Sequence, residues 1–247
     1  PIQELLLSGG DPMMLTNSSL YGFFQAAGRS GVNIIRIGTK ELAFRPERFD
    51  EPFFETLRVA HREFPEMHIN FVVHFTHPDE FLYRDSEGSY VPNTDGNTGY
   101  KWLPLNRYSV EKLLEMPFVS LENQTPIVSR VNDSEDSLRI LHVELRRLGI
   151  KPKYIFQGRD IEGHQAFSLP IEEAWSIHNA AMKGLSDTCR SRLSMSTEWG
   201  KMEIVSVLDP LNLHVGPTNQ CAHAQYKLLN DLFSDGLIVF KLHRSPY

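Results

Sequence analysis

The chain has 247 residues, of which 41% are hydrophobic and 23% charged, so it is long enough to bury the core of one large globular domain. Its 25 basic and 31 acidic residues give a formal net charge of −6, which argues against binding nucleic acid or an anionic membrane, because both need a basic surface. No apolar run has the length of a membrane span, and Cys189 and Cys221 are too few for a disulfide framework. We therefore expect a cytoplasmic protein with a small-molecule ligand, and we keep a homo-oligomer as an alternative to a monomer.

Apolar, β-rich runs alternate with longer amphipathic runs along the chain. Five runs are predicted as strands, at residues 2–8, 33–39, 68–75, 119–128 and 153–157. Four runs are predicted as helices, at residues 18–29, 51–64, 134–148 and 170–185. This alternation predicts a parallel sheet, either a barrel or a doubly wound sheet. In both folds, ligands bind at the carboxyl ends of the strands.

Two segments do not follow the alternation. Residues 82–105 are rich in Gly, Asn, Asp and Tyr, which predicts an inserted loop. Residues 210–236 separate two β-rich runs, 203–208 and 237–242, which we expect to pair as a carboxyl-terminal hairpin. We therefore divide the chain into a main unit, residues 1–208, and an extension, residues 209–247. Because an apolar run starts directly after Pro1, we also expect the chain to be a piece of a longer protein.

Polar clusters stand where the predicted strands end. They are Gly9-Gly10-Asp11, Arg36-Ile37-Gly38-Thr39, His74-Phe75-Thr76-His77-Pro78, Glu122-Asn123-Gln124 and Gln157-Gly158-Arg159. Each cluster alone is a weak signal, since a turn after a strand is commonly polar. In a barrel, however, all of them meet at one mouth. The pattern therefore predicts a ligand site at that mouth.

Two smaller features have a structural and a functional interpretation. His74 and His77 could share a metal ion, but no third ligand is evident by spacing, so we expect hydrogen-bonded histidines near a strand end. Lys201 follows Trp199-Gly200 and opens a β-rich run, and a partly desolvated lysine can form a Schiff base with pyridoxal phosphate. From the residues alone, a solvated lysine at a turn is the favoured interpretation. Neither a G-x-S-x-G pattern nor a phosphate-binding loop is present.

Taken in chain order, these clusters resemble the lysine 2,3-aminomutase family of radical S-adenosylmethionine enzymes. Residues 5–15, Leu-Leu-Leu-Ser-Gly-Gly-Asp-Pro-Met-Met-Leu, resemble that family's LLTGGDPLML-like strand end, and residues 74–80 resemble its HFNHPNE block. Weaker likenesses follow in the same order, at residues 34–39, 45–48, 123–133 (the NQS…RGVND stretch) and 151–157 (the RPYYxxQ strand). Gly200-Lys201-Met202 stands where the family has Gly-Lys-Ile at its pyridoxal-binding lysine.

The resemblance implies an α/β fold, a partial (β/α)6 TIM-type barrel of the radical S-adenosylmethionine class, with the carboxyl-terminal hairpin as an extension. It implies that Gly9, Gly10 and Asp11 lie against the methionine part of S-adenosylmethionine. Arg36, His74 and Gln124 would line the same mouth, and Lys201 would carry pyridoxal phosphate. The family's C-x-x-x-C-x-x-C motif, which binds a [4Fe-4S] cluster, is expected upstream of residue 1. We therefore expect no metal ligand in this chain and no activity from this chain alone.

Departures from the family concern the substrate. Lysine-specific members hold the distal ammonium of lysine with two aspartates, one in a Gln-Cys-Asp sequence, where this chain has Gln157-Gly158-Arg159 with Asp160 one place later. The other aspartate corresponds to Ser194. The resemblance thus predicts a 1,2-amino shift, initiated by an adenosyl radical, on an amino acid other than lysine. The alternatives are a radical enzyme without pyridoxal phosphate and a degenerate barrel without catalytic activity.

Overall fold

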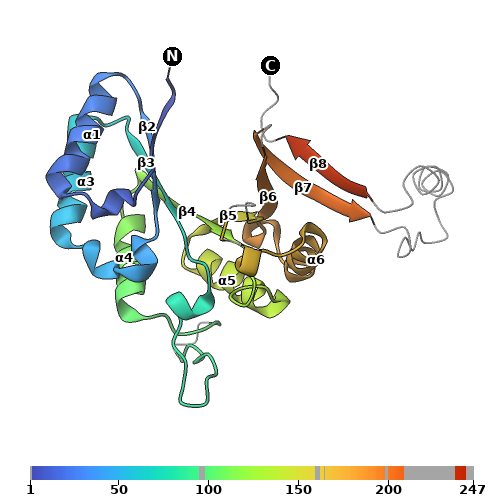
Figure 1. Cartoon of the computed structure of the whole chain (residues 1–247). Helices are drawn as coiled ribbons and strands as arrows, with labels where there is room; N and C mark the ends of the chain where they lie inside the picture. The colour runs from blue at the N-terminus through green and yellow to red at the C-terminus, as the bar shows by residue number, and fades with distance from the viewer. Residues whose placement is uncertain are drawn as a thin grey trace.

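The computed structural model describes residues 2–94, 98–158, 162–163, 165–197, 200–208 and 237–242. Its strands form one sheet in the order in which they occur in the chain (Figure 1). They are β1 (Glu4–Leu7), β2 (Ile34–Thr39), β3 (His68–Val73), β4 (Val119–Pro126), β5 (Lys151–Phe156), β6 (Arg192–Thr197), β7 (Gly200–Leu208) and β8 (Leu237–Leu242).

The sheet is parallel from β1 to β6, whereas β7 and β8 are added in antiparallel order. Within the described residues, β1 pairs only with β2 and β8 only with β7, so the sheet does not close on itself. The predicted class, an α/β fold with a mostly parallel, partial barrel, is confirmed. The expected hairpin is also confirmed in its two strands, while residues 209–236 between them lie outside the described part.

Helices fill most of the connections between the parallel strands. They are α1 (Asn17–Arg29), α2 (Glu41–Phe44), α3 (Glu51–Glu63), α4 (Pro104–Leu114), α5 (Glu135–Arg147) and α6 (Ile171–Met182). The short 3-10 turns are η1 (Pro12–Met14), η2 (Pro46–Arg48), η3 (Pro78–Glu80), η4 (Gln165–Phe167) and η5 (Asp187–Cys189). Three helices begin at a capping side chain that accepts a backbone N–H, namely Thr16, Asp50 and Ser134. In Figure 1, α1 lies beside α3 and α5 beside α6.

Alternate residues of each central strand belong to two different environments. Ile35 of β2, Phe71 of β3 and Leu121 of β4 are buried in the core formed with the helices. Their neighbours in sequence, such as Arg36 and Glu122, lie on the opposite face and are only partly buried. The strand period of two therefore places a row of polar side chains on the face of the sheet that the helices do not cover.

Sequence and structure differ at several boundaries. β5 begins at Lys151 rather than at residue 153. Pro152 lacks an N–H, but the strand accommodates it because the β4–β5 register shifts there and the hydrogen bonds between β5 and β6 begin only after it. β6 was not predicted, because its sequence, Arg-Leu-Ser-Met-Ser-Thr, has few apolar residues. α4 was missed as well: it starts at Pro104, inside the predicted loop. The described residues in the rest of that loop form isolated antiparallel bridges, such as the one from Leu82 to Trp102.

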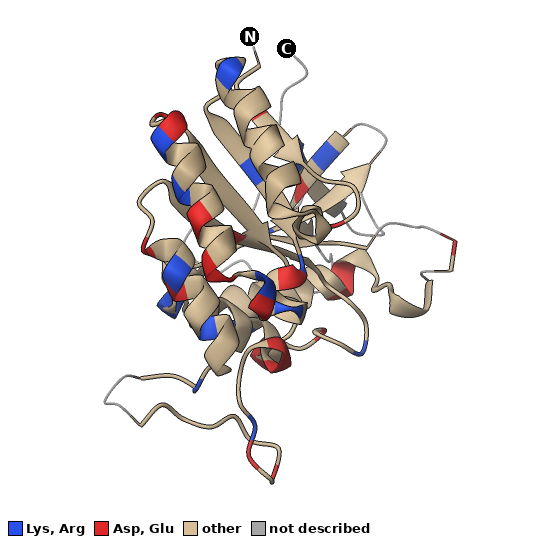
Figure 2. Cartoon of the chain, turned by 90° about the vertical axis from the view of Figure 1, so that its left-hand side faces the viewer, with Lys and Arg blue, Asp and Glu red and all other residues tan. Residues whose placement is uncertain are grey.

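Charges of both signs are mixed over the outer helices, as Figure 2 shows. On α3, for example, Arg58 pairs with Glu51 and Glu55, and Arg62 also pairs with Glu55. Such exposed pairs contribute little to stability. In the described part of the chain, none of the helices combines the length and the apolarity that crossing a membrane requires.

A buried hydrogen-bond network connects α5, α6 and the start of β6. The Nδ1 atom of His142 lies 2.6 Å from the carbonyl of Leu138, which can only accept, so His142 carries its proton on Nδ1. The Ser191 hydroxyl therefore donates to Nε2 of His142, at 2.7 Å, and accepts from Nε2 of His178, at 3.2 Å. Burial lowers the pKa of His142 to about 4, and burial together with His142 lowers the pKa of His178 to about 3. Both imidazoles are thus neutral at neutral pH.

We predict that this network makes the fold sensitive to acid. The unfolded chain takes up protons on both histidines near pH 6.5, whereas the folded chain resists protonation until about pH 4, so stability falls as pH falls through this window. The slope is at most about 1.4 kcal/mol per pH unit for each imidazole. Urea unfolding across the window should show this loss, and His142→Gln should be less stable at neutral pH but have a shallower slope. An unchanged slope in the variant would contradict the assignment.

Candidate functional site

All seven predicted site residues lie around one cavity. The cavity has a volume of about 410 Å³ and opens at the carboxyl ends of the first strands. Its lining includes the seven predicted residues Gly9, Gly10, Asp11, Arg36, His74, Gln124 and Lys201. Four of the five polar strand ends therefore meet here, as predicted, whereas Gln157 and Gly158 of the fifth line a second cavity. The role of each residue toward a ligand stays a prediction.

The Asp11 carboxylate connects the end of β1 to the end of β2. It accepts hydrogen bonds from the backbone N–H of Met13 at 3.0 Å, the Thr39 hydroxyl at 2.7 Å and the backbone N–H of Lys40 at 2.6 Å. Asp11 thus fixes the wall of the cavity as well as lining it. Gly9 has a φ of +119°, which only glycine adopts readily, and a Cβ at Gly10 would meet no atom within 4 Å. The space next to Gly10 is therefore open to a ligand.

Lys40 is a cavity residue that sequence reasoning missed. Its ammonium donates to the carbonyl of His74 at 2.6 Å, the hydroxyl of Thr76 at 2.9 Å and the carboxylate of Glu80 at 2.7 Å. Burial lowers the pKa of Lys40, against the opposing effect of Glu80. All three ammonium donors are engaged, so Lys40 holds the end of β2 to the end of β3. Its position directly after the predicted strand end at residue 39 was the available signal.

His74 and Gln124 contact each other across the mouth of the sheet. The amide nitrogen of Gln124 lies 3.1 Å from Nε2 of His74, which accepts the hydrogen bond in its neutral form. Burial lowers the pKa of His74, and the nearby Lys40 charge lowers it further. His77 instead accepts the backbone N–H of Asp79 and begins η3, as the structural interpretation expected. Among the residues described by the structure, no group of three His, Cys, Asp or Glu is placed to hold a metal ion.

Below this mouth, the polar face of the sheet carries two ion pairs. Arg36 on β2 pairs with Glu4 on β1, and Lys153 on β5 pairs with Glu122 on β4. The amide of Asn70 donates a further hydrogen bond to Glu122 at 3.0 Å. Burial raises the pKa of Glu122, but the hydrogen bonds from Lys153 and Asn70 outweigh this, and the pKa is lowered. The Glu122 carboxylate is therefore ionised and neutralises the Lys153 ammonium.

Lys201 has a different environment from these paired cations. It lies on β7 opposite Ser196 of β6, and its ammonium lies over two aromatic rings of β5, 4.1 Å from the ring centre of Phe156 and 4.6 Å from that of Tyr154. Among the described residues, it has no hydrogen-bond or ion-pair partner. Burial, together with the charges of Arg36 and Lys153, lowers its pKa to about 8. The solvated lysine favoured from the residues alone is therefore not what the structure shows.

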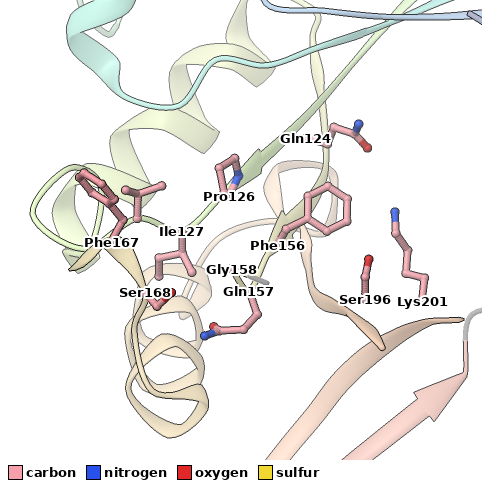
Figure 3. A pocket seen from close by; sticks show the side chains of 11 residues that line it. Gln124, Pro126, Ile127, Phe156, Gln157, Gly158, Phe167, Ser168, Ser196 and Lys201 are labelled. Carbon is pink, nitrogen blue, oxygen red and sulfur yellow. The ribbon is translucent and has the colours of Figure 1, made fainter. Parts of the chain in front are cut away.

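A second, larger cavity of about 640 Å³ begins at Lys201 (Figure 3). It is lined by Gln124, Pro126, Ile127, Val128, Phe156, Gln157, Gly158, Phe167, Ser168, Ser196 and Lys201. Gln124 and Lys201 line both cavities. Ser194, at the position where the resemblance predicts a family aspartate, is fully buried in β6, and its carbonyl accepts the N–H of Gln157 at 2.7 Å. Arg159 and Asp160 lie outside the described residues.

We predict that Lys201 reacts with aldehydes at a lower pH than the other lysines do. A folded-state pKa of about 8, against an ordinary value of 10.5, makes a large share of its amine neutral under mildly basic conditions. Reductive methylation at a series of pH values, followed by peptide mass spectrometry, should give a labelling midpoint near pH 8 for Lys201. A labelling profile that coincides with the profiles of the other lysines would disprove the lowered pKa.

Lys153→Met should raise the pKa of Lys201. The substitution removes one of the two positive charges that lower this pKa, and it leaves the Glu122 carboxylate without its nearest cation. The labelling midpoint of Lys201 should therefore move to higher pH. Lys153→Arg is the matched control, because it keeps the charge and should leave the midpoint near its original value. Equal labelling midpoints in both variants would show that the charge of Lys153 does not lower the pKa of Lys201.

Comparison with known proteins gives relatives of one kind. No protein-family model matches the sequence. The chain is 33% identical over 211 residues to a "Putative L-lysine 2,3-aminomutase" from Aquifex aeolicus, an alignment that covers 84% of this chain and 50% of the relative. It is 27% identical over 177 residues to a "Glutamate 2,3-aminomutase" from Clostridioides difficile, covering 71% of this chain and 35% of the relative.

Among solved structures, a domain of pyruvate-formate lyase-activating enzyme from Bacteroides vulgatus is similar, with a TM-score of 0.46 and 15% identity over 76% of this chain and 97% of that one. The chain spans half or less of the length of the two curated relatives. Over most of its own length, the chain is thus a homologue of the lysine 2,3-aminomutase-like radical S-adenosylmethionine proteins.

Proposed function

We propose that the protein is a radical S-adenosylmethionine enzyme that moves an amino group to the neighbouring carbon of an amino acid, with pyridoxal phosphate held on Lys201. The observation that carries this proposal is the position of Lys201 between the two cavities. A single amine of lowered pKa borders both the glycine-rich cavity and the larger, more apolar one. Chemistry that joins two bound molecules needs such a shared boundary, because the reacting atoms must approach closely.

The glycine-rich cavity fits the methionine part of S-adenosylmethionine. The open space beside Gly10 admits a ligand to the backbone, and the Asp11 carboxylate offers negative charge toward an ammonium group. Arg36, His74 and Gln124 add donors and acceptors around the same volume. With two cysteines in its sequence, the chain cannot itself supply the three thiolates that a [4Fe-4S] cluster would need.

The larger cavity fits pyridoxal phosphate at its reactive end. The Lys201 amine is partly buried and easily deprotonated, as a lysine that reacts with an aldehyde must be. Phe156 offers an aromatic surface beside it, and the Ser196 hydroxyl lies on the neighbouring strand (Figure 3). For the phosphate end, the described lining residues near Lys201 offer the hydroxyl group of Ser196 and no guanidinium.

The chain's own residues would prepare this reaction in three ways. When bound, S-adenosylmethionine with its cluster supplies an adenosyl radical, and pyridoxal phosphate stabilises the rearranging substrate. Asp11 and Lys40 hold three strand ends in place, so the walls of the first cavity are fixed before binding. Burial, together with the charges of Arg36 and Lys153, lowers the pKa of Lys201 and keeps its amine partly neutral. Neutral His74 and Gln124 line the boundary without adding charge.

Lysine is not the substrate that the site favours. A second ammonium group buried without a carboxylate partner is costly, by several kcal/mol. Ser194 is a buried hydroxyl where lysine-specific relatives are expected to have a carboxylate, and none of the described residues lining the larger cavity is acidic. We therefore propose an amino acid other than lysine.

One observation favours a second candidate, a radical enzyme that does not use pyridoxal phosphate. Within the described part of the larger cavity, Lys201 is the only cationic side chain. If its amine forms the covalent bond with the aldehyde of pyridoxal phosphate, no second cation of the described lining pairs with the phosphate group. The two candidates differ in a single covalent bond, which can be detected directly.

We predict that borohydride reduction of the protein loaded with pyridoxal phosphate attaches a pyridoxyl group to Lys201. Peptide mass spectrometry should find the modification there. In the longer protein that also carries the cluster-binding cysteines, Lys201→Ala should lose the modification and at least a hundred-fold of the amino shift, while cleavage of S-adenosylmethionine persists. Lys151→Ala, at an exposed position, is the control for unspecific modification. Full amino-shift activity in Lys201→Ala would exclude pyridoxal chemistry on this residue and favour the second candidate.

A further inference from the structure

The larger cavity has two unlike ends. In Figure 3, Lys201 and Ser196 lie at one end, whereas Ile127 and Phe167 lie at the other, with Phe156 between them. If the amino group of a substrate is held near Lys201, its side chain extends toward Ile127 and Phe167. The chemistry of that second end therefore selects the side chain of the substrate.

Backbone hydrogen bonds build the second end, so it does not depend on flexible side chains. The N–H of Ile127 donates to the carbonyl of Phe156 at 2.8 Å, which joins the segment after β4 to the end of β5. The N–H of Ser129 donates to the carbonyl of Phe167 at 3.0 Å, which joins η4 to the same segment. Ile127 is 1% exposed, while Phe167 is 57% exposed at the rim. A large apolar side chain left open at the edge of a cavity gains from contact with an apolar ligand.

The charge of the wall points to the same class of ligand. Among the described residues that line the larger cavity, Lys201 carries the only charge, and it lies at the opposite end. The described residues of this wall would offer an ammonium group near Ile127 and Phe167 no carboxylate partner, and they would offer a carboxylate no cation. Only an uncharged side chain avoids that cost.

We infer that the substrate is an α-amino acid with a large, uncharged, apolar side chain, of the kind found in leucine, methionine or phenylalanine. This inference rests on the proposed function, since it takes the amino group to be held at Lys201. The volume of about 640 Å³ is within the range of small-molecule sites and leaves room for a side chain beside a cofactor ring.

The test is equilibrium dialysis of labelled amino acids against the protein loaded with pyridoxal phosphate, without reductant, so that binding is measured and not turnover. Leucine, methionine and phenylalanine should bind at least ten-fold more tightly than lysine or glutamate. Phe167→Glu places a carboxylate at the apolar end and, because this side chain is exposed, should not disturb folding. It should shift the preference toward lysine by at least ten-fold, whereas Phe167→Leu, the matched apolar control, should keep the original order.

Lysine or glutamate binding as tightly as the apolar amino acids in the unaltered protein would overturn the inference. Asp160→Asn then identifies the cause: a preference for lysine that disappears in this variant would assign the recognition of its ammonium to Asp160. An unchanged preference in Phe167→Glu would also overturn it. The borohydride experiment separates this inference from the proposed function. If pyridoxal phosphate is trapped on Lys201 but lysine binds most tightly, only the inferred substrate class is refuted. If apolar amino acids bind most tightly but no pyridoxal phosphate is trapped, only the pyridoxal chemistry is refuted.

Discussion

The site depends first on a chain of charged hydrogen bonds that fixes the ends of three strands. Asp11, after β1, binds the Thr39 hydroxyl and the Lys40 N–H at the end of β2, and the Lys40 ammonium binds the His74 carbonyl and Glu80 after β3. A parallel sheet that does not close into a barrel has no ring of strands to hold its mouth in shape. These bonds supply that constraint where the sheet lacks it, and charge-assisted hydrogen bonds in a partly buried place are among the stronger ones.

The environment of Lys201 is a balance of opposing effects. Burial and two nearby cations favour the neutral amine, while the faces of Phe156 and Tyr154 attract the charged form. The result is an amine that exists in both forms near pH 8, which suits a group that must be a nucleophile and still be held in position.

Much of this could be predicted from the sequence, and the parts that could not share a physical cause. Strands such as β2 and β3 were predicted because their alternating apolar residues report directly on burial. β6 was missed because its burial is decided by neighbours that are distant in sequence, β5 and β7, and not by its own composition. The sequence predicted that Gly9, His74 and Gln124 lie near one another, because the topology brings the ends of parallel strands to one edge of the sheet. It did not predict the hydrogen-bond partners of Asp11 and Lys40, since side-chain contacts between strands depend on register and on distances of a few ångströms.

The distribution of charge explains why one amine stands apart in an interior that contains several cations. Arg36, Lys40 and Lys153 each have a carboxylate partner, in Glu4, Glu80 and Glu122 respectively. These pairs cancel most of the charge on the polar face of the sheet, yet the cations of two of them remain close enough to lower the pKa of Lys201. A carboxylate beside Lys201 would have the opposite effect, holding the amine protonated and unreactive. Two features are therefore equally important to the site. The surrounding cations are paired with carboxylates, and Lys201 itself has no carboxylate partner among the described residues.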